Sequence, residues 1–403
     1  MNPRIYLDHA ATTPVDPRVV ETMLPYWTEY WGNPSSIYQE AQEARKGLDT
    51  ARRTIAEILG AKPQEIVFTG GGSEADNLAV RGAALASRRR GDHIITSQIE
   101  HHAVLHTVQQ LERDGFQATY LPVDGEGFID LEALERAVTD RTTVVSIMLA
   151  NNEVGTIQPI AEIARIVKAR NPKVIVHTDA VQAAGALDLN VDQLGVDLLS
   201  IAAHKVYGPK GVGALYVRRR TPLQPLILGG SQEKDRRAGT ENVAGAVGFA
   251  TALTLAYDEF DARNAHSRAL RDRLLAEIPA RIPYTRVNGP RDPTRRISNN
   301  VNVCFQFVEG EAVLLALDMN GVAASSGSAC TSGSLEPSHV LTAMAVPDEI
   351  ARSSLRLSVG RDNTPDQIEH VLAVLPKFVE RLRSLSPINA TTPSVELLAG
   401  RRD

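Results

Sequence analysis

The sequence has few cysteines, few aromatic residues and no long hydrophobic run. Two cysteines among 403 residues cannot form a disulfide framework, and they suit a reducing compartment, so we expect a cytoplasmic protein. The N-terminal residues lack a basic start followed by an apolar signal segment, and no apolar run is long enough to cross a bilayer. A net charge of -5 argues against direct binding to nucleic acid. We therefore expect neither membrane attachment nor a nucleic-acid partner.

The two cysteines have contrasting neighbours. Cys304 lies in "VNVCFQF", which is typical of a buried core thiol, whereas Cys330 lies in "SSGSACTSGS", a run of small polar residues. Glycine and serine give such a loop little apolar content and access to unusual backbone angles. The second pattern predicts an exposed thiol on a mobile loop, although the same composition also fits a static turn.

Short β-rich runs alternate with helical patterns through the first two-thirds of the chain. This alternation predicts an α/β fold with a mostly parallel central sheet, helices on both faces, and ligands bound beyond the carboxyl ends of the strands. The expected strands are 65–69, 93–97, 142–149, 173–179, 196–202 and 213–217, and clear helical patterns cover 130–138 and 160–169.

The length exceeds that of one hydrophobic core, so we expect a second, smaller domain. A helical segment over 249–278 leads to strand-like 300–307, helical 310–321, strand-like 353–360 and a helix from Thr364, which indicates a small α+β domain. We expect a large cofactor-binding domain at 15–255, a small domain at 1–14 and 256–385 that carries the Cys330 loop, and a flexible tail at 386–403.

Three places with chemical potential each follow a predicted strand. Gly70–Gly72 and Ser73 could hold a phosphate at the start of a helix, or could form a tight turn with a serine N-cap. Asp179 could serve a ligand or only cap a helix. Lys205 could form a Schiff base if it is desolvated, or could be a surface lysine.

Because all three places follow strands of the same predicted sheet, they are expected to converge. An anion cradle, a carboxylate and a lysine are together what pyridoxal 5'-phosphate requires. The spacing of His101, His102 and His106 would suit zinc on a helix, but no third ligand accompanies it, so we expect no metal site.

Ten motifs now identify a family. They are "YLDHAATTPVDPRV", "GNPSS", "TGGGSEADN", "EHHAV", "NNEVGTIQP", "HTDAVQAAG", "AHKVYGPKGVGALYV", "RRAGTEN", "SSGSACTSGSLEPSHVL" and "SSLRLSVGR". In this order the motifs closely resemble the pyridoxal-phosphate-dependent cysteine desulfurases of the NifS/IscS type, from about Ile5 to the 380s. The resemblance implies fold type I of the pyridoxal enzymes, in the class V aminotransferase family, and a homodimer.

The resemblance also implies roles for individual residues. Lys205 resembles the Schiff-base lysine, Asp179 the partner of the pyridinium nitrogen, and His101 the residue that stacks on the ring and assists proton transfer. Cys330 resembles the sulfur acceptor. The other implied cofactor contacts are Gln182, Asn152, Gly72, Ser73, His204 and, from the second subunit, Thr240; the implied substrate contacts are Arg356 and Asn33. Out of context, Arg356 would be a strand-edge arginine paired with a carboxylate.

One position departs from the family pattern. Many relatives have a phosphate-binding serine where this chain has Ala202. The missing hydrogen bond should weaken cofactor binding by about 1 to 3 kcal/mol if nothing else satisfies the anion.

The implied activity is that of a sulfurtransferase. L-Cysteine is converted to L-alanine, and its sulfur stays on Cys330 as a persulfide for an acceptor such as an iron–sulfur cluster scaffold or a tRNA-thiolation enzyme. Three alternatives remain open: a selenocysteine lyase, an aminotransferase of the same fold, and a non-catalytic sulfur-transfer scaffold.

Overall fold

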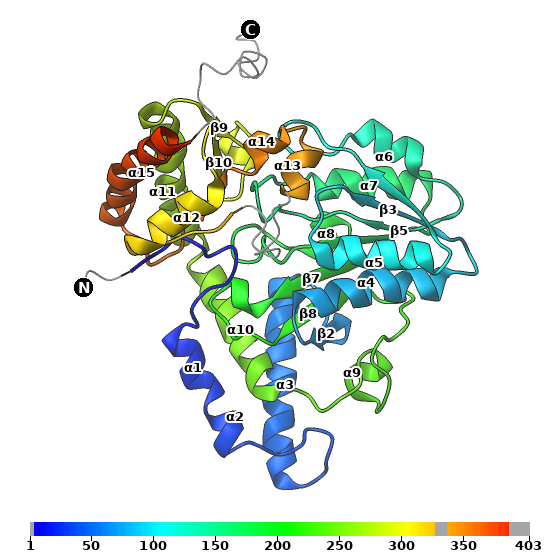
Figure 1. Ribbon diagram of the computed structural model, residues 1–403. Coiled ribbons are helices and arrows are strands. Elements are labelled where there is room, and N and C mark those ends of the chain that lie inside the picture. The colour runs from blue at the N-terminus through cyan, green and yellow to red at the C-terminus, as the bar shows by residue number, and fades with distance from the viewer. Residues whose placement is uncertain (1–3, 327–336, 387–403) are drawn as a thin grey trace. The chain divides into compact units, whose positions relative to one another are not determined.

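A computed structural model describes residues 4–326 and 337–386 (Figure 1). The chain divides into two compact units. The large unit comprises Thr12–Asn152 and Thr156–Asn264, and the small unit comprises Met1–Ala11, Glu153–Gly155 and Ala265–Asp403. This division does not test the domain ranges that we expect from the sequence, and they stay a prediction. Cys330 and the tail beyond residue 386 lie outside the described residues.

Seven strands form the sheet of the large unit, in the order β2-β8-β7-β6-β5-β3-β4. They are β2 (Ile66–Thr69), β3 (His93–Ser97), β4 (Gln117–Leu121), β5 (Thr142–Ser146), β6 (Ile175–Asp179), β7 (Leu198–Ala202) and β8 (Gly213–Val217). Only β8 runs antiparallel to its neighbours in this sheet. The predicted α/β class and all six predicted strands are confirmed, whereas β4 was missed.

Helices flank this sheet (Figure 1). They are α1 (Pro17–Met23), α2 (Pro25–Thr28), α3 (Gln39–Ile58), α4 (Gly72–Ser87), α5 (His102–Arg113), α6 (Leu131–Ala137), α7 (Ile160–Arg170), α8 (Val191–Leu194), α9 (Gln232–Asp235) and α10 (Val243–Asp258). The apolar sides of α4 and α5, including Ala75, Val104 and Val108, pack on Val144 and Ile175 of the sheet. Burial of such side chains is the main favourable contribution to folding.

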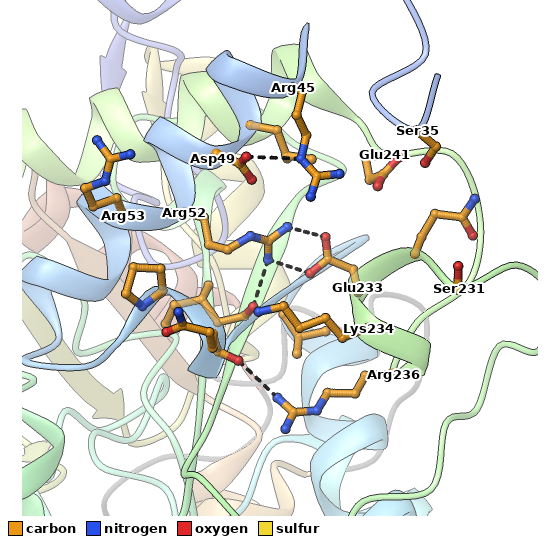
Figure 2. Close-up of a pocket in the computed structure, with 16 residues that line it drawn as sticks. Ser35, Arg45, Asp49, Arg52, Arg53, Ser231, Glu233, Lys234, Arg236 and Glu241 are labelled. Atoms are coloured by element: carbon orange, nitrogen blue, oxygen red, sulfur yellow. Dashed lines mark hydrogen bonds and ion pairs between the residues drawn. The ribbon is translucent and has the colours of Figure 1, made fainter. Parts of the chain in front are cut away.

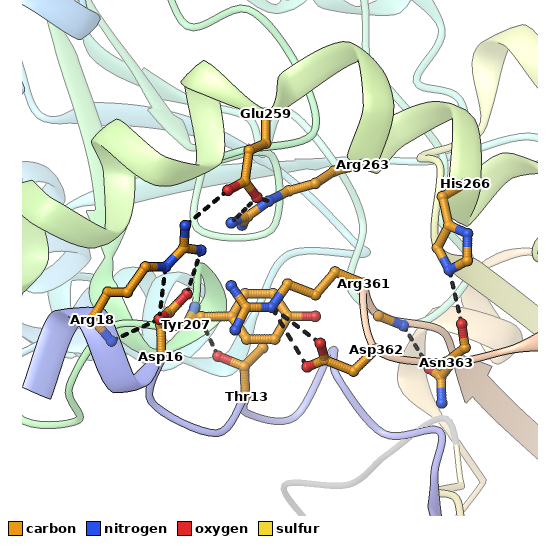
Figure 3. Close-up of polar contacts among 11 residues, drawn as sticks. Thr13, Asp16, Arg18, Tyr207, Glu259, Arg263, His266, Arg361, Asp362 and Asn363 are labelled. Carbon is orange, nitrogen blue, oxygen red and sulfur yellow. Dashed lines mark hydrogen bonds and ion pairs between the residues drawn. The ribbon is translucent and has the colours of Figure 1, made fainter.

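The predicted helical segment over 249–278 is two helices rather than one. α10 ends at Asp258 and α11 (Phe260–Arg281) follows, because Glu259 has φ -101° and ψ 15°. The Glu259 carboxylate accepts hydrogen bonds from Arg18 at 3.1 Å and Arg263 at 2.7 Å (Figure 3). Both ion pairs lie within the large unit, at the junction between the two helices.

The small unit contains two short sheets. β12 (Ser354–Ser358), β10 (Asn300–Phe305) and β9 (Thr285–Val287) are antiparallel, and β1 (Ile5–Tyr6) pairs in parallel with β11 (Val322–Ala323). Its further helices are α12 (Gly310–Met319), α13 (His339–Ala343), α14 (Asp348–Ala351) and α15 (Pro365–Leu385). A capping box at Thr364 confirms the predicted start of the last helix. Among the described residues, no helix has the length and apolar composition needed to cross a bilayer.

Candidate active site

The ends of two neighbouring parallel strands bring an acid and a lysine together. β6 ends at Asp179, and β7 ends at Ala202, directly before a one-turn 3-10 helix (Ala203–Lys205). The positive charge of Lys205 acts on the Asp179 carboxyl and opposes the rise of its pKa. An anionic and a cationic side chain therefore face the same region at the carboxyl end of the sheet.

Asp179 is buried, with 5% of its surface exposed. Burial raises the pKa of this carboxyl to about 6, while a hydrogen bond from the Val181 N–H, at 2.9 Å, lowers it. The alternative that Asp179 caps a helix is wrong, because turns rather than a helix follow it. This desolvated carboxylate can pair with a buried cationic ring nitrogen.

A polar row lies on the same sheet face as Asp179. The His177 ring contacts Ser146 Oγ at 2.8 Å and Ser200 Oγ at 3.0 Å, and its Nε2 lies 3.7 Å from an Asp76 oxygen on α4. Burial lowers the pKa of His177 to about 3 and raises that of Asp76 well above its usual range. Sequence reasoning missed these residues, although strand alternation places His177 on the face of Asp179.

The glycine loop approaches the strand ends closely. A Cβ atom on Gly72 would lie 2.8 Å from Val181 Cγ2 and 3.5 Å from Ala202 Cβ, so a side chain is excluded there. Gly71 has φ 153° and is the N-cap of α4 without any side-chain hydrogen bond to the first turn. The predicted alternative of a serine N-cap is therefore wrong, because Ser73 is the second residue of the helix. This helix start offers backbone N–H groups to an anion.

His101 borders the same loop. Its Nδ1 accepts a hydrogen bond from the Ala103 N–H at 3.1 Å, which makes His101 the N-cap of α5 and leaves Nε2 as the protonated nitrogen of a neutral ring. His101 and Ser73 both line a hollow of about 370 Å³. The His102 and His106 rings stack at 4.9 Å, and no group of three potential metal ligands occurs among the described residues.

The turn that carries Lys205 contains a second histidine. His204 Nδ1 lies 3.1 Å from Thr12 Oγ1, and burial, helped by the charges of Lys205 and Lys210, lowers the pKa of His204 to about 4. A neutral His204 can donate one hydrogen bond from its ring. Lys205 is half-buried, as desolvation of a reactive amine requires.

The remaining predicted residues have different surroundings. In the large unit Gln182 and Asn152 are half-buried, and Asn33 and Thr240 are exposed. In the small unit Arg356 is 2% exposed, pairs with Asp8 at 2.9 Å, and exchanges two backbone hydrogen bonds with Ser325. The carboxylate contact foreseen for an ordinary strand-edge arginine is thus present.

The two cysteines can be compared only in part, because Cys330 lies outside the described residues. Cys304 is fully buried on β10, its sulfur accepts a hydrogen bond from Asn288 at 3.1 Å, and burial raises its pKa to about 11. The predicted core role of Cys304 is confirmed, since a protonated, enclosed thiol is a poor nucleophile.

These residues fit pyridoxal 5'-phosphate. Gly72 leaves room that a side chain would fill, α4 begins without a side-chain cap, and buried Asp179 lies within the electrostatic influence of Lys205. The donors suit a phosphate, the carboxylate suits a pyridinium nitrogen, and the lysine suits an aldehyde. Each requirement of the cofactor has a matching group in the large unit.

Comparison with known proteins assigns the family. Residues 5–371 match the family model described as aminotransferase class-V. The chain is 52% identical over 388 residues to "Cysteine desulfurase IscS" of Clostridium botulinum (strain Hall), covering 96% of this chain and 97% of that protein. It is also 52% identical over 387 residues to the protein of the same name from Methanosarcina thermophila, covering 96% and 95%.

Solved structures agree with the sequence comparison. A "NIFS-LIKE PROTEIN" has a TM-score of 0.88 at 38% identity, with 94% of this chain and all of that chain covered. The apo cysteine desulfurase from Thermococcus onnurineus has a TM-score of 0.84 at 26% identity, with 94% and 95% covered. The chain therefore has the fold type I architecture, belongs to the class-V aminotransferase family, and groups within it with the cysteine desulfurases of the NifS/IscS type.

Proposed function

We propose that this protein binds pyridoxal 5'-phosphate at the carboxyl end of its seven-stranded sheet and converts L-cysteine to L-alanine. The observation that carries the proposal is that buried Asp179 lies within the electrostatic influence of Lys205, at the sheet edge that the uncapped start of α4 approaches. In the net reaction the C–S bond of cysteine breaks, an S–S bond forms with Cys330, and the substrate carbon gains a hydrogen. The enzyme thiol thereby becomes a persulfide.

The bound cofactor supplies an electron sink for the carbanion that forms at the substrate α-carbon. Asp179 provides a fixed negative charge for the ring nitrogen, in surroundings where burial strengthens that interaction. Lys205 would hold the cofactor through its amine and, as a free amine, would take the α-proton of the substrate. His101 would stack on the ring, and its Nε2–H side would assist proton transfer.

The phosphate group of the cofactor would meet the first turn of α4. Gly72 and Ser73 offer backbone N–H groups there, and His204 adds a neutral ring. Gln182 contacts the phenolic oxygen, and Asn152 is a further cofactor contact. Ala202 provides no hydroxyl, so these groups hold the anion without the serine common in relatives.

Substrate binding is assigned to Arg356, with Asn33. An arginine can hold a carboxylate by two parallel hydrogen bonds, and burial of Arg356 favours such an interaction. Arg356 would then bind both the Asp8 carboxylate and the substrate carboxylate. Cys330 acts as a thiolate toward the substrate sulfur.

A homodimer completes the site, because Thr240 is assigned to the phosphate bound by the second subunit. The exposed Thr240 side chain is compatible with such an assignment. Large apolar side chains that a monomer would leave in water support it further: Trp27 is 56% exposed, Trp31 63%, Ile37 94% and Leu228 79%.

The persulfide supplies sulfur to an acceptor protein, such as an iron–sulfur cluster scaffold or a tRNA-thiolation enzyme, in the cytoplasm. A selenocysteine lyase or an aminotransferase would use much the same lysine and aspartate. Cys330 favours sulfur transfer over transamination, and the retained catalytic groups argue against a non-catalytic scaffold.

The test incubates the purified, cofactor-loaded protein with L-cysteine and a thiol reductant and measures alanine and sulfide. Cys330→Ser is expected to keep the visible absorbance of the bound cofactor and lose turnover, whereas Lys205→Ala loses covalent attachment of the cofactor. Cys304→Ala is the matched control and is expected to retain turnover. Wild-type protein that keeps its cofactor yet forms no alanine would refute the proposal, and a parallel assay with selenocysteine tests the lyase alternative.

A further inference from the structure

A buried threonine near the N-terminus contacts the turn that carries Lys205. Thr13 is 2% exposed. Its N–H and its hydroxyl both donate to the His204 carbonyl oxygen, at 3.0 and 2.9 Å. Its hydroxyl oxygen accepts a hydrogen bond from the Tyr207 N–H at 2.8 Å (Figure 3). One side chain therefore fixes the backbone directly before Lys205 and two residues after it.

The hydrogen bonds from Thr13 use the full accepting capacity of the His204 carbonyl oxygen. A carbonyl oxygen has two lone pairs, and both donors on Thr13 occupy the His204 oxygen. The threonine hydroxyl donates once and accepts once, so it links His204 and Tyr207 as a bridge. Valine, which has the same shape, could make neither side-chain bond.

The turn needs such support because its backbone is strained. Tyr207 has φ 65°, a left-handed conformation that costs a non-glycine residue roughly 1–2 kcal/mol. The Val206 and Gly208 N–H groups both donate to the Ala203 carbonyl, each at 3.0 Å, which closes the turn tightly around Lys205. Loss of the hydrogen bonds that the Thr13 hydroxyl makes with this turn would let the turn relax toward ordinary backbone angles.

A second layer of contacts holds Tyr207. The Asp16 N–H donates to the Tyr207 carbonyl at 2.9 Å, and the Asp16 carboxylate binds Arg18 at 2.8 Å. Arg18 reaches Glu259, Glu259 binds Arg263, and the Arg263 guanidinium lies 5.6 Å from the Tyr207 ring centroid (Figure 3). These contacts return to Tyr207, whereas the Thr13 hydroxyl contacts both Tyr207 and His204, which lies directly before Lys205.

We propose that Thr13 is a positioning residue for Lys205: its hydroxyl holds the 204–207 turn so that the lysine amine is directed toward Asp179 and the cofactor. The inference rests on the proposed function, since it concerns the lysine that function requires. Thr13 itself touches neither substrate nor cofactor in this account.

The experiment compares Thr13→Val and Thr13→Ala with Thr13→Ser, which keeps the hydroxyl. Thr22→Val is the matched control, because the Thr22 hydroxyl also donates to a backbone carbonyl in the large unit, that of Val19 at 2.8 Å. Apoprotein is titrated with pyridoxal 5'-phosphate. Borohydride reduction and peptide mass spectrometry then quantify covalent attachment at Lys205, and turnover of L-cysteine is measured on the same samples.

Thr13→Val and Thr13→Ala are expected to weaken cofactor attachment about tenfold and to lower kcat about tenfold, with KM for cysteine within twofold of wild type. Thr13→Ser and Thr22→Val should resemble wild type in all three measurements. If one of the two truncating variants does not fold, the other gives the same comparison.

Three results would overturn the proposal. Truncating variants that attach the cofactor and turn over like wild type would refute it, and so would a Thr13→Ser variant as impaired as Thr13→Val. Wild-type protein that does not attach the cofactor at Lys205 would refute the proposed function as well, so the two failures are distinguishable.

Discussion

Removal of the Glu233 carboxylate is expected to release the segment 231–241 from the large unit. Glu233 accepts hydrogen bonds from both terminal nitrogens of Arg52, each at 2.6 Å (Figure 2). It also accepts a hydrogen bond from the Phe68 N–H of β2 at 2.9 Å. The side chains of Glu233 and Arg52 are only 3% and 11% exposed. Loss of one partner of a buried pair costs about 3–5 kcal/mol, because the other charge stays buried without compensation.

The free energy stored as backbone strain in the segment 231–241 is similar to the cost of losing one partner of the Arg52–Glu233 pair. Glu233, Lys234 and Asp235 have φ angles of 47°, 57° and 63°, three consecutive non-glycine residues in the left-handed region. At roughly 1–2 kcal/mol each, this conformation costs about 3–6 kcal/mol in total. The cost of leaving Arg52 buried without Glu233 is therefore similar to the backbone strain, so removal of the carboxylate should open the segment locally rather than unfold the protein.

Hydrogen exchange of peptides covering β2 and 231–241 measures this opening. Glu233→Ala should raise the opening equilibrium about a hundredfold to a thousandfold, which corresponds to the loss of about 3–4 kcal/mol. The matched control is Asp49→Asn, because Asp49 pairs with Arg45 at 3.0 Å beside the same pocket, with both side chains about half exposed (Figure 2). Exposed pairs contribute about 0.2–1 kcal/mol, so this control should leave exchange nearly unchanged.

A double-mutant cycle separates the pair from other effects. Arg52→Met combined with Glu233→Ala should cost less than the sum of the two single changes, because the double variant buries no unpaired charge. The reasoning would be refuted if hydrogen exchange in Glu233→Ala equalled that of wild type. It would also be refuted if the free-energy costs of the two single changes added up to the cost of the double change. Since Thr240 belongs to the same segment, opening should also weaken the proposed contact with the second subunit.

Three further predictions concern cofactor binding and pH. Ala202→Ser should tighten pyridoxal 5'-phosphate binding to apoprotein about tenfold in a titration, whereas Ala214→Ser, a buried change on the other face of the sheet, should not. Asp179→Asn should keep covalent cofactor attachment but lower kcat at least about a hundredfold. Burial raises the pKa of Glu153 to about 7 from 4.5, so the native state keeps a proton that the unfolded state releases, and stability falls as pH rises from about 4.5 to 7. Glu153→Gln should remove about 3 kcal/mol of this pH dependence, measured as the change in Tm between pH 5 and pH 7.5, and equal dependence in both proteins would contradict it.

Apolar runs predicted the sheet well because buried parallel strands are hydrophobic on both faces. β4 was missed because three of its five residues are half-buried and Gln117 is exposed, as befits the edge of the sheet, so its sequence is more polar. The break at Glu259 was missed because neither glycine nor proline marks it, and the Glu259 carboxylate contacts Arg18, which lies far away in the sequence.

In the candidate site, too, residues with a local sequence signal could be predicted, whereas contacts between residues far apart in the sequence could not. Lys205 and Asp179 could be found from their positions after predicted strands, and family motifs supported both. Thr13 carries no local signal for its contact with the Lys205 turn, because that contact joins residues 191 positions apart. His177 depends on strand register, which pairs it with Ser146 and places Asp179 opposite Ser200.

The buried acids around the site explain how one negative charge is kept for the cofactor. Burial raises the pKa of Asp76 well above its usual range and that of Glu100 to about 8, so Glu100 is protonated near neutral pH. Asp179 is equally enclosed, but the Val181 N–H and the charge of Lys205 hold its pKa at about 6. A neutral His177 adds no competing positive charge. The protein thus desolvates three carboxyl groups together and gives Asp179 the partners that favour its ionised form, which places negative charge where a protonated ring nitrogen would bind.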